Sequence, residues 1–218
     1  MQGLKKAGAT LLSGVGVQSF AKQGAEVVTT YQKGDTRQTV ASQIVIVATG
    51  RKPLTRGMGL EEAGVQTNLR GYVMTDEAMR TSVPGIYAIG DITGKQQLAH
   101  VASAQGIVAA DNIAGIAAKM RYDAVPACVY TTPEIASVGL TEAQAAEQGY
   151  QIATGSFPVP ANGRSMIHGT QAGAAQIITD KNTGEILGAH LCAPNATEMI
   201  SEIALGMNGE VTIGELSA

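Results

Sequence analysis

The sequence predicts an α/β fold in its first half, followed by an α+β domain. Two apolar runs predict the α/β part. The run at 43–48 is continuously β-branched and ends at Gly50, and the run at 81–91 ends in Gly-Asp just before a small-residue helix pattern. The pattern changes after Arg121, where a linker at 122–126 precedes alternating strand patterns and two helix patterns. This change predicts a domain boundary near residue 122.

The start of the chain predicts short elements rather than a nucleotide-binding unit. A basic turn followed by Gly8 is typical of a helix end. The stretch beginning at Gly14 imitates a G-x-G-x-x-G loop, but Ser19 takes the place of the third glycine, and only residues 17–23 remain for a crossover helix. A parallel crossover needs about a dozen residues. We therefore expect antiparallel strands at about 10–13, 15–20, 25–32 and 36–40.

The middle of the chain predicts two buried strands. We expect the first at 43–48, buried on both faces, and the second at 86–89, where it would deliver Asp91 to the carboxyl edge of a sheet. The alternative for Asp91 is an ordinary strand and turn, since Gly and Asp are turn residues. Short elements are also expected between them, a helix ending at Gly64 and a strand at 71–76.

A helix is expected from Gln97 to about Met120. Its apolar residues recur at helical spacing: Leu98, Val101, Ala102, Ala109, Ile113 and Ile116. Many Ala and Gly residues on this face would allow a flat ligand or another backbone to approach closely, and plain helix packing explains them equally well.

The last third predicts an α+β domain. Strands are expected at 127–130, 151–159, 174–179 and 185–191. A capping box at Thr141 opens one helix, and a run from Pro194 opens another, with Met199, Ile200 and Ile203 on its inner side.

Composition restricts the classes of function. The chain is 44% hydrophobic and contains 27 glycines, which is typical of a globular protein with a core. It has no Trp, few aromatic residues, a net charge of -3 and no basic run, so a nucleic-acid partner is not expected. No run reaches membrane-spanning length, and the first residues lack a signal-peptide core. We therefore expect a soluble, cytoplasmic protein without a membrane partner.

The motifs together resemble the flavin-disulfide pyridine nucleotide oxidoreductases, and within this family most closely the enzymes that oxidise dihydrolipoamide. The matching stretches are 46–53, 81–91, 97–100, 130–139, 161–164 and 188–198. The family's two G-x-G-x-x-G loops, its C-x-x-x-x-C pair and its H-x-H-P motif have no counterpart here. Cys128 and Cys192 form neither a C-x-x-C nor a zinc pattern, and we expect them to be buried structural thiols.

The resemblance implies three segments and a set of cofactor contacts. The segments are the tail of an NAD-binding domain at 1–48, the second half of an FAD-binding domain with a Rossmann-like fold at 49–121, and a dimerisation domain at 122–218. The implied FAD contacts are Gly90, Asp91, Gln97, Leu98, Ala99 and His100. The implied NAD contacts are Gly50 and Val17, and for Val17 a core position is an equal alternative. No catalytic residue or metal site is expected in this chain.

The resemblance also implies the activity and the partners. The expected reaction is FAD-dependent oxidation of dihydrolipoamide with electron transfer to NAD, in a homodimer that serves the lipoyl domains of a 2-oxo acid dehydrogenase complex. We expect the chain by itself to be inactive. Two alternatives stay open: a sibling reductase acting on glutathione, mercuric ion or peroxide, and a dimerisation module without catalytic function.

Overall fold

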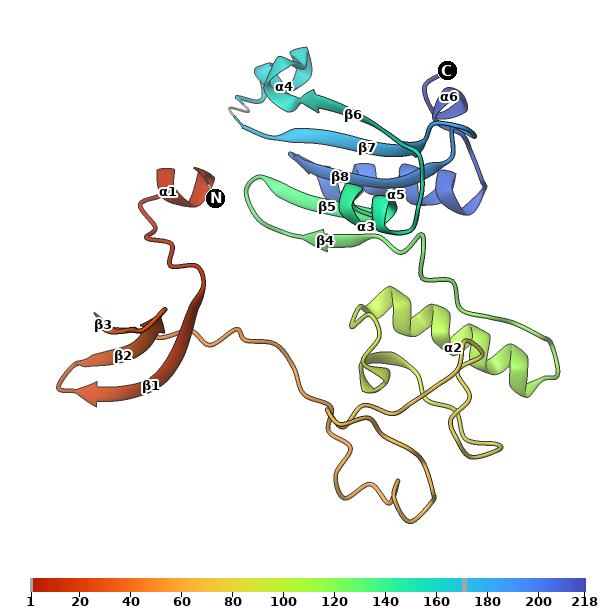
Figure 1. The fold of residues 1–218 in the computed structure, drawn as a ribbon, viewed down its shortest axis with the longest axis horizontal. Helices are drawn as coiled ribbons and strands as arrows, with labels where there is room; N and C mark the ends of the chain where they lie inside the picture. Colours follow the sequence, from red (N-terminus) through yellow and green to blue (C-terminus); the bar gives the residue numbers. More distant parts are fainter. Residues whose placement is uncertain (1, 170–171) are drawn as a thin grey trace. The chain divides into compact units, whose positions relative to one another are not determined.

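The computed structural model describes residues 2–169 and 172–218 (Figure 1). The chain falls into two compact units, residues 1–51 and residues 52–218, and each is described by itself.

The first unit consists of a short helix and a three-stranded antiparallel sheet. Helix α1 (Gln2–Lys6) precedes strands β1 (Val15–Gln23), β2 (Glu26–Lys33) and β3 (Thr36–Ser42), which pair in the order β1-β2-β3. Each hairpin has a two-residue turn that opens on a glycine, Gly24 at φ 63° and Gly34 at φ 56°, and such turns favour antiparallel pairing. The antiparallel prediction is confirmed. The strand predicted at 10–13 is wrong, because this stretch is irregular.

The apolar run after β3 does not form the predicted buried strand. Residues 44–50 carry no regular structure, and the side chains of Ile44, Ile46 and Val47 are 79%, 86% and 65% exposed. A strand buried on both faces needs a neighbour on each side. The part of the first unit that the structure describes offers no such neighbour, because its sheet holds only β1, β2 and β3.

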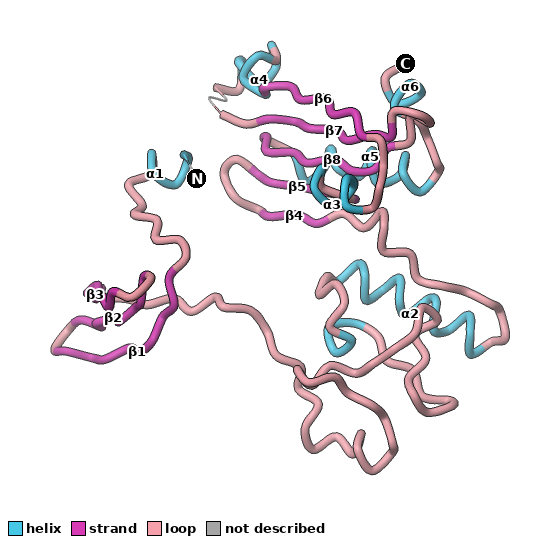
Figure 2. The backbone as a smooth tube through the Cα atoms, in the orientation of Figure 1, coloured by secondary structure: helices cyan, strands magenta, loops and turns pink. Residues whose placement is uncertain are grey.

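The second unit begins with a region of turns and loops, drawn in pink in Figure 2. The stretch predicted as strand 86–89 is extended but pairs only through one isolated bridge, between Arg80 and Tyr87. A tight turn closed by the N–H of Ile86 and the carbonyl of Val83 makes this a miniature hairpin, too short to be a strand. The expected helix at 61–64 is a single hydrogen-bonded turn, and the expected strand at 71–76 contributes one bridge at Val73.

Helix α2 (Ala99–Ile113) is the long helix of this region, and it ends earlier than predicted. Gly115 adopts φ 82°, and the N–H of Ile116 donates back to the carbonyl of Asp111. A glycine in the left-handed conformation with this bond ends a helix. The buried stripe is also different, since Val101, Gln105 and Ala109 face the core while Ile113 is 67% exposed.

The C-terminal part of the second unit is a five-stranded antiparallel sheet with helices. The predicted α+β class is confirmed, but the strand at 134–139 was not predicted. The strands β4 (Ala127–Val129), β5 (Glu134–Gly139), β6 (Ile152–Pro158), β7 (Ala174–Asp180) and β8 (Ile186–Ala193) pair in the order β4-β5-β8-β7-β6. The helices are α3 (Glu142–Glu147), α4 (Gly163–Ile167), α5 (Ala196–Asn208) and α6 (Ile213–Leu216).

Two helices cover opposite faces of this sheet. Helix α5 packs its Ile200 and Ile203 onto the face that carries Ala136 and Leu191, and these residues form the main core. Helix α3 covers Ile178 on the other face through Ala145. Each fully buried aliphatic side chain contributes about 1.5–3 kcal/mol, so the sheet and α5 supply most of the stability of this part. Met199, predicted on the inner side of α5, is 50% exposed, because it lies one residue outside the buried stripe.

Candidate functional site

The Gly90–Asp91 turn is held against helix α2. It forms the start of a short 3-10 helix, η1 (Gly90–Thr93), which packs on α2. Gly90 is buried at φ 75°, where a Cβ atom would lie 3.4 Å from the Cβ of Ala102. The hydroxyl of Thr93 donates to the carbonyl of Gly90 over 2.9 Å. A tight approach to α2 therefore fixes the backbone that carries Asp91, whose side chain is half-buried.

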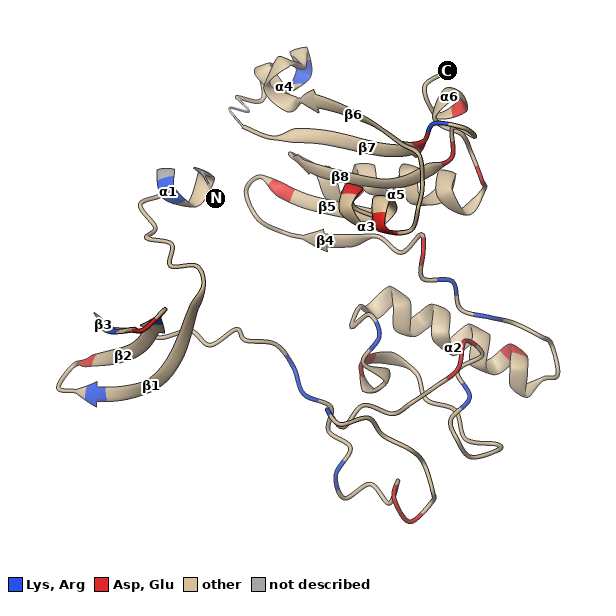
Figure 3. Ribbon diagram, viewed as in Figure 1, with Lys and Arg blue, Asp and Glu red and all other residues tan. Residues whose placement is uncertain are grey.

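The N-terminus of α2 lies in the same part of the unit, and no side chain caps it. Leu98 occupies the N-cap position at φ -128° and ψ 140°, and it offers no side-chain acceptor to the first turn. Figure 3 shows α2 almost free of charge, with Asp111 as its single acidic residue. The helix dipole adds a partial positive charge at this end. Uncapped N–H groups with this polarity suit a ligand that carries acceptor atoms or negative charge.

The residues predicted around this helix start have their own contacts. The side-chain amide of Gln97 donates from Nε2 to the hydroxyl of Tyr72 over 3.4 Å. The ring of His100 is bonded through Nε2 to the carbonyl of Pro126 over 3.0 Å, which ties α2 to the start of β4. Ala99 is exposed at the first helical position. The backbone of Leu98, Ala99 and His100 is thus the part that could meet a ligand.

A pocket of about 350 Å³ opens beside this helix start. It is lined by Gln96, Gln97, Leu98, Val125, Ala127, Ser137, Val138 and Gly139. Its volume is at the lower end of the range for small-molecule sites, which suits a ring system rather than a whole dinucleotide. The buried Oε1 atom of Gln96 has no hydrogen-bond partner among residues 2–169 and 172–218. A buried acceptor without a donor is unfavourable, so this oxygen carries a local energetic cost beside the pocket.

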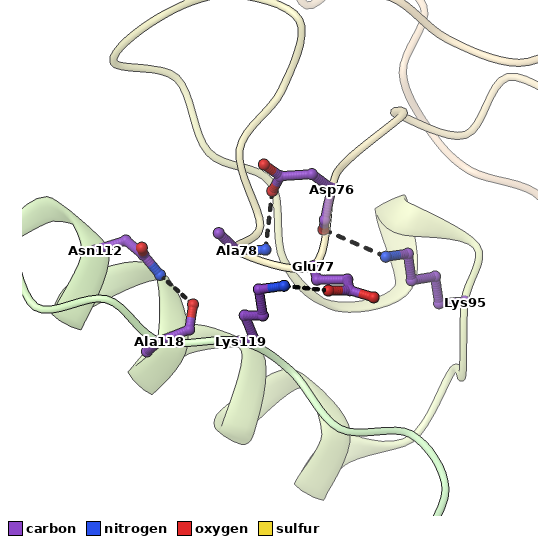
Figure 4. A network of polar contacts seen from close by, with 7 residues as sticks. All are labelled: Asp76, Glu77, Ala78, Lys95, Asn112, Ala118 and Lys119. Carbon is purple, nitrogen blue, oxygen red and sulfur yellow. Dashed lines mark hydrogen bonds and ion pairs between the residues drawn. The ribbon is translucent and has the colours of Figure 1, made fainter.

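The loop at 76–77, before the turn, is bonded to segments on both sides of α2, to Lys95 before the helix and to Lys119 after its end. Figure 4 shows the Nζ of Lys95 on the carbonyl of Asp76 at 3.4 Å, and the ion pair between Glu77 and Lys119 at 3.1 Å. Asn112 donates from Nδ2 to the carbonyl of Ala118 over 2.8 Å. The ion pair is well exposed and contributes less than about 1 kcal/mol. These contacts hold the loop in place.

The segment that leads to the C-terminal sheet is fixed beside the same helix. Arg121 and Asp123 form a two-pronged contact at 2.6 and 3.2 Å, and the bond from Arg121 lowers the pKa of the Asp123 carboxyl. Between them, Tyr122 receives a hydrogen bond on its hydroxyl from Nε2 of Gln105 over 2.9 Å. Lys95 lies over the Tyr122 ring with Nζ 5.1 Å from the centroid.

Val17 and Gly50 belong to the other compact unit. Val17 lies on β1 opposite Tyr31 and is 54% exposed, so the alternative of a core position is wrong. Gly50 is exposed at φ 104°, a conformation that favours glycine. Their role as NAD contacts stays a prediction.

The two cysteines are free thiols. Cys128 on β4 pairs with Ala136 on β5, and Ala136 pairs in turn with Leu191 on β8. Cys192 follows Leu191 and therefore projects from the opposite face of the sheet. Both thiols are half-buried, and burial raises the pKa of Cys128. A disulfide between them is excluded by this register.

Sequence reasoning missed Gln96, Gln105 and Tyr72. Gln105 was detectable in principle, because it is a polar residue midway between Val101 and Ala109 on an apolar helix stripe. Gln96 and Tyr72 gave no such signal, since their contacts come from loops. Within the described residues, no cluster of His, Cys, Asp and Glu could hold a metal ion, and no helix is long and apolar enough to cross a membrane.

Comparison with known proteins finds two family profiles. The one described as "Pyridine nucleotide-disulphide oxidoreductase" matches residues 1–106, and the one described as "Pyridine nucleotide-disulphide oxidoreductase, dimerisation domain" matches residues 125–218. Among curated proteins, the chain is 46% identical to a dihydrolipoyl dehydrogenase of Chlamydia muridarum over 196 residues, which is 87% of this chain and 42% of the relative. It is 42% identical to that of Corynebacterium glutamicum over 219 residues, which is 98% of this chain and 47% of the relative.

Solved structures of flavoprotein disulfide reductases and related proteins have the same fold as this chain. LpdA from Mycobacterium tuberculosis superposes with a TM-score of 0.90 at 32% identity, over 99% of this chain and 46% of LpdA. The HOCl-induced flavoprotein disulfide reductase RclA of Escherichia coli superposes with a TM-score of 0.84 at 28% identity, over 97% of this chain and 48% of RclA. The chain spans about half the length of the relatives it matches.

Proposed function

Because the chain belongs to the pyridine nucleotide-disulphide oxidoreductase family, we propose that residues 90–100 form one half of an FAD site. The observation that carries this proposal is the packing of the Gly90–Asp91 turn against α2, next to an uncapped helix start and a pocket. The family binds FAD and NAD, and the fold is an FAD/NAD-binding part followed by a dimerisation domain.

Each residue has a distinct role in this site. The carboxylate of Asp91 accepts a hydrogen bond from a hydroxyl of the ribityl chain, and Gly90 lets that chain come close. The backbone of Leu98, Ala99 and His100 meets the edge of the flavin ring, and Gln97 lies at the same edge. The helix start favours negative charge there by about 0.3–2 kcal/mol, depending on burial. When bound, FAD supplies the two-electron redox chemistry.

The proposed reaction is the oxidation of dihydrolipoamide to lipoamide by NAD⁺. Two electrons and one proton reduce NAD⁺, and the second proton is released. Gly50 is the proposed contact to NAD, and Val17 is the proposed contact to the adenosine side of NAD. The proposed parent enzyme serves lipoyl domains of a 2-oxo acid dehydrogenase complex. We predict that this chain by itself does not oxidise dihydrolipoamide, because it has no C-x-x-x-x-C pair and its two cysteines lie on opposite faces of a sheet.

A titration of the purified chain with FAD tests the site. We expect quenching of flavin fluorescence, and Asp91→Asn should weaken FAD binding by about tenfold or more, since a hydrogen bond to a charged group contributes about 1.5–3 kcal/mol. Asp111→Asn is the matched control, because it removes the same charge from the other end of α2. Equal FAD affinity for the Asp91 variant and the control would contradict the assignment, as would wild-type chain that binds no FAD.

A second proposed role is self-association through residues 122–218. β4 is an edge strand, and its Val129 pairs with Ile135 on β5, where both side chains are about half exposed at 51% and 46%. The neighbouring Tyr130 is 82% exposed. An apolar edge of this kind is typical of an interface. We expect a homodimer by analytical ultracentrifugation, and a Val129→Lys change should shift it towards monomer. A wild-type chain that sediments as monomer at micromolar concentration argues against this role.

The alternative substrate class is that of a sibling disulfide reductase. RclA, a flavoprotein disulfide reductase, is 28% identical to this chain, over 97% of this chain's length. Identity to the dihydrolipoyl dehydrogenases reaches 48%. These values favour dihydrolipoamide. Assays of the parent enzyme with dihydrolipoamide, glutathione disulfide and mercuric ion distinguish the two classes.

A further inference from the structure

Gln105 is a fully buried amide in the middle of an apolar helix stripe. Its exposed fraction is 0%, between Val101 at 1% and Ala109 at 6%. Burying an amide is unfavourable unless its polar atoms are bonded, and an aliphatic side chain would fill the same stripe without that requirement. Both ends of the Gln105 amide are bonded, which indicates that the amide itself is needed at this position.

The two bonds of this amide reach two different segments. Oε1 accepts from the buried N–H of Gly90 over 2.6 Å, and Nε2 donates to the hydroxyl of Tyr122 over 2.9 Å. We propose that Gln105 is a positioning residue, whose single amide fixes both the Gly90–Asp91 turn and the segment that leads into the C-terminal sheet. This inference rests on the proposed flavin site, and it adds a residue that touches no cofactor.

The turn depends on this bond because Gly90 has few other means to satisfy its N–H. Gly90 is buried and packs on Ala102, so water does not replace a lost acceptor easily. Asp91 is the next residue, and a shift of the turn moves its carboxylate directly. A displacement of less than 1 Å is enough to weaken a hydrogen bond that requires a fixed geometry.

The Nε2 end of the Gln105 amide holds Tyr122, in the segment that links α2 to the C-terminal sheet. Tyr122 packs in the cluster of Met79, Val101 and Met120, and Lys95 lies over its ring. Three residues later, Val125 lines the pocket. One side chain on α2 thus sets the position of the ribityl contact on one side and of a pocket wall on the other.

The substitutions at this position separate positioning from stability. Gln105→Met keeps the volume but removes both bonds. Gln105→Glu keeps both, because a carboxyl group accepts from the Gly90 N–H and bonds the Tyr122 hydroxyl in either protonation state. The matched control is Asn112→Leu, at the far end of the same helix. It removes a side-chain amide with three bonds: Nδ2 donates to the carbonyls of Val108 and Ala118, and Oδ1 accepts from Arg80.

The experiment measures FAD affinity, thermal stability and hydrogen exchange of the Gly90 amide by NMR in the same full-length chain. We expect Gln105→Met to bind FAD at least tenfold more weakly and its Gly90 amide to exchange at least tenfold faster, while Gln105→Glu retains affinity within about threefold. Asn112→Leu should lower the melting temperature without changing FAD affinity.

Two results overturn the inference. The first is a Gln105→Met chain whose Gly90 amide stays protected. The second is a loss of FAD affinity that Asn112→Leu reproduces at equal stability, because the effect would then come from stability alone. Wild-type chain that binds no FAD contradicts the proposed function instead, and the exchange measurement still decides whether Gln105 holds the turn.

Discussion

Gly139 at the end of β5 lies where the sheet has no room for a side chain. Its φ is 73°, and a Cβ atom built there would meet the carbonyl oxygen of Leu187 and lie 2.8 Å from both the Cα of Gly188 and the Cε of Met207. Gly188 is its register partner on β8 and is equally crowded, by the backbone of Leu140. The change Gly139→Ala therefore tests how tightly this corner of the sheet is packed.

The expected cost has two parts. An alanine in the left-handed conformation costs about 1–2 kcal/mol. Overpacking against backbone atoms that cannot move aside costs roughly 1–3 kcal/mol more. A total near 3 kcal/mol corresponds to a fall in melting temperature of about 6–12 °C for a domain of this size. This is a large part of the ~5–15 kcal/mol stability of a typical domain.

Thermal unfolding followed by far-ultraviolet circular dichroism measures this effect. Gly155→Ala on β6 is the matched control, because its φ is not in the left-handed region and no atom lies within 4 Å of its added Cβ. We expect this control to unfold within about 1–2 °C of the wild type, since a compatible Gly→Ala change is neutral or slightly stabilising. Equal melting temperatures for the two variants would refute the reasoning, because the crowding at Gly139 would then have no energetic consequence. Since Gly139 lines the pocket, the same change should also weaken FAD binding.

Further predictions concern acid stability, thiol chemistry and helix capping. Glu134 accepts from the N–H and hydroxyl of Thr197, which lowers the pKa of its carboxyl below the ordinary 4.5. The stabilisation that the Glu134 carboxylate provides is therefore present above pH 4.5 and is lost as the pH falls through the lower pKa that Glu134 has in the folded chain. Between pH 7 and pH 3, the difference in melting temperature between the wild type and Glu134→Gln should become smaller. A difference that stays constant contradicts this. Cys128 and Cys192 should form no intrachain disulfide under mild oxidation, and a mass loss of two hydrogens in non-reducing peptide mapping would disprove their placement. Thr141→Ala should destabilise α3 by about 1 kcal/mol, read as a lower urea midpoint, because it breaks a complete capping box.

The position of the candidate site along the chain was predictable from the sequence, because its residues lie in one continuous stretch; their roles toward a cofactor stay predictions. Gly90, Asp91 and Leu98 to His100 are close in the chain, so local turn and helix signals suffice to place them together. The same holds for the antiparallel sheets, whose short connections leave few other pairings. Thr141 and Gln144 specify the start of α3 by their own side chains, and the structure has both bonds.

Features that depend on distant partners were not predictable. The apolar run at 44–47 has the composition of a buried strand, but a strand forms only when neighbours supply backbone hydrogen bonds, and here the run is exposed. The segment 86–89 forms one bridge instead of a strand for the same reason. The end of α2 was misplaced because apolar spacing continues to Ile116, while the φ of 82° at Gly115 stops the helix.

The sequence by itself determined the family, the antiparallel hairpins of the first unit and the Gly-Asp turn, because these depend on residue identity and spacing along the chain. The tertiary structure alone decided that Gln105 joins this turn to Tyr122 and that Cys128 and Cys192 face opposite sides of the sheet. The physical reason is that hydrogen bonding and burial of side chains are settled between segments, and strand register and helix packing fix them only when the chain is folded.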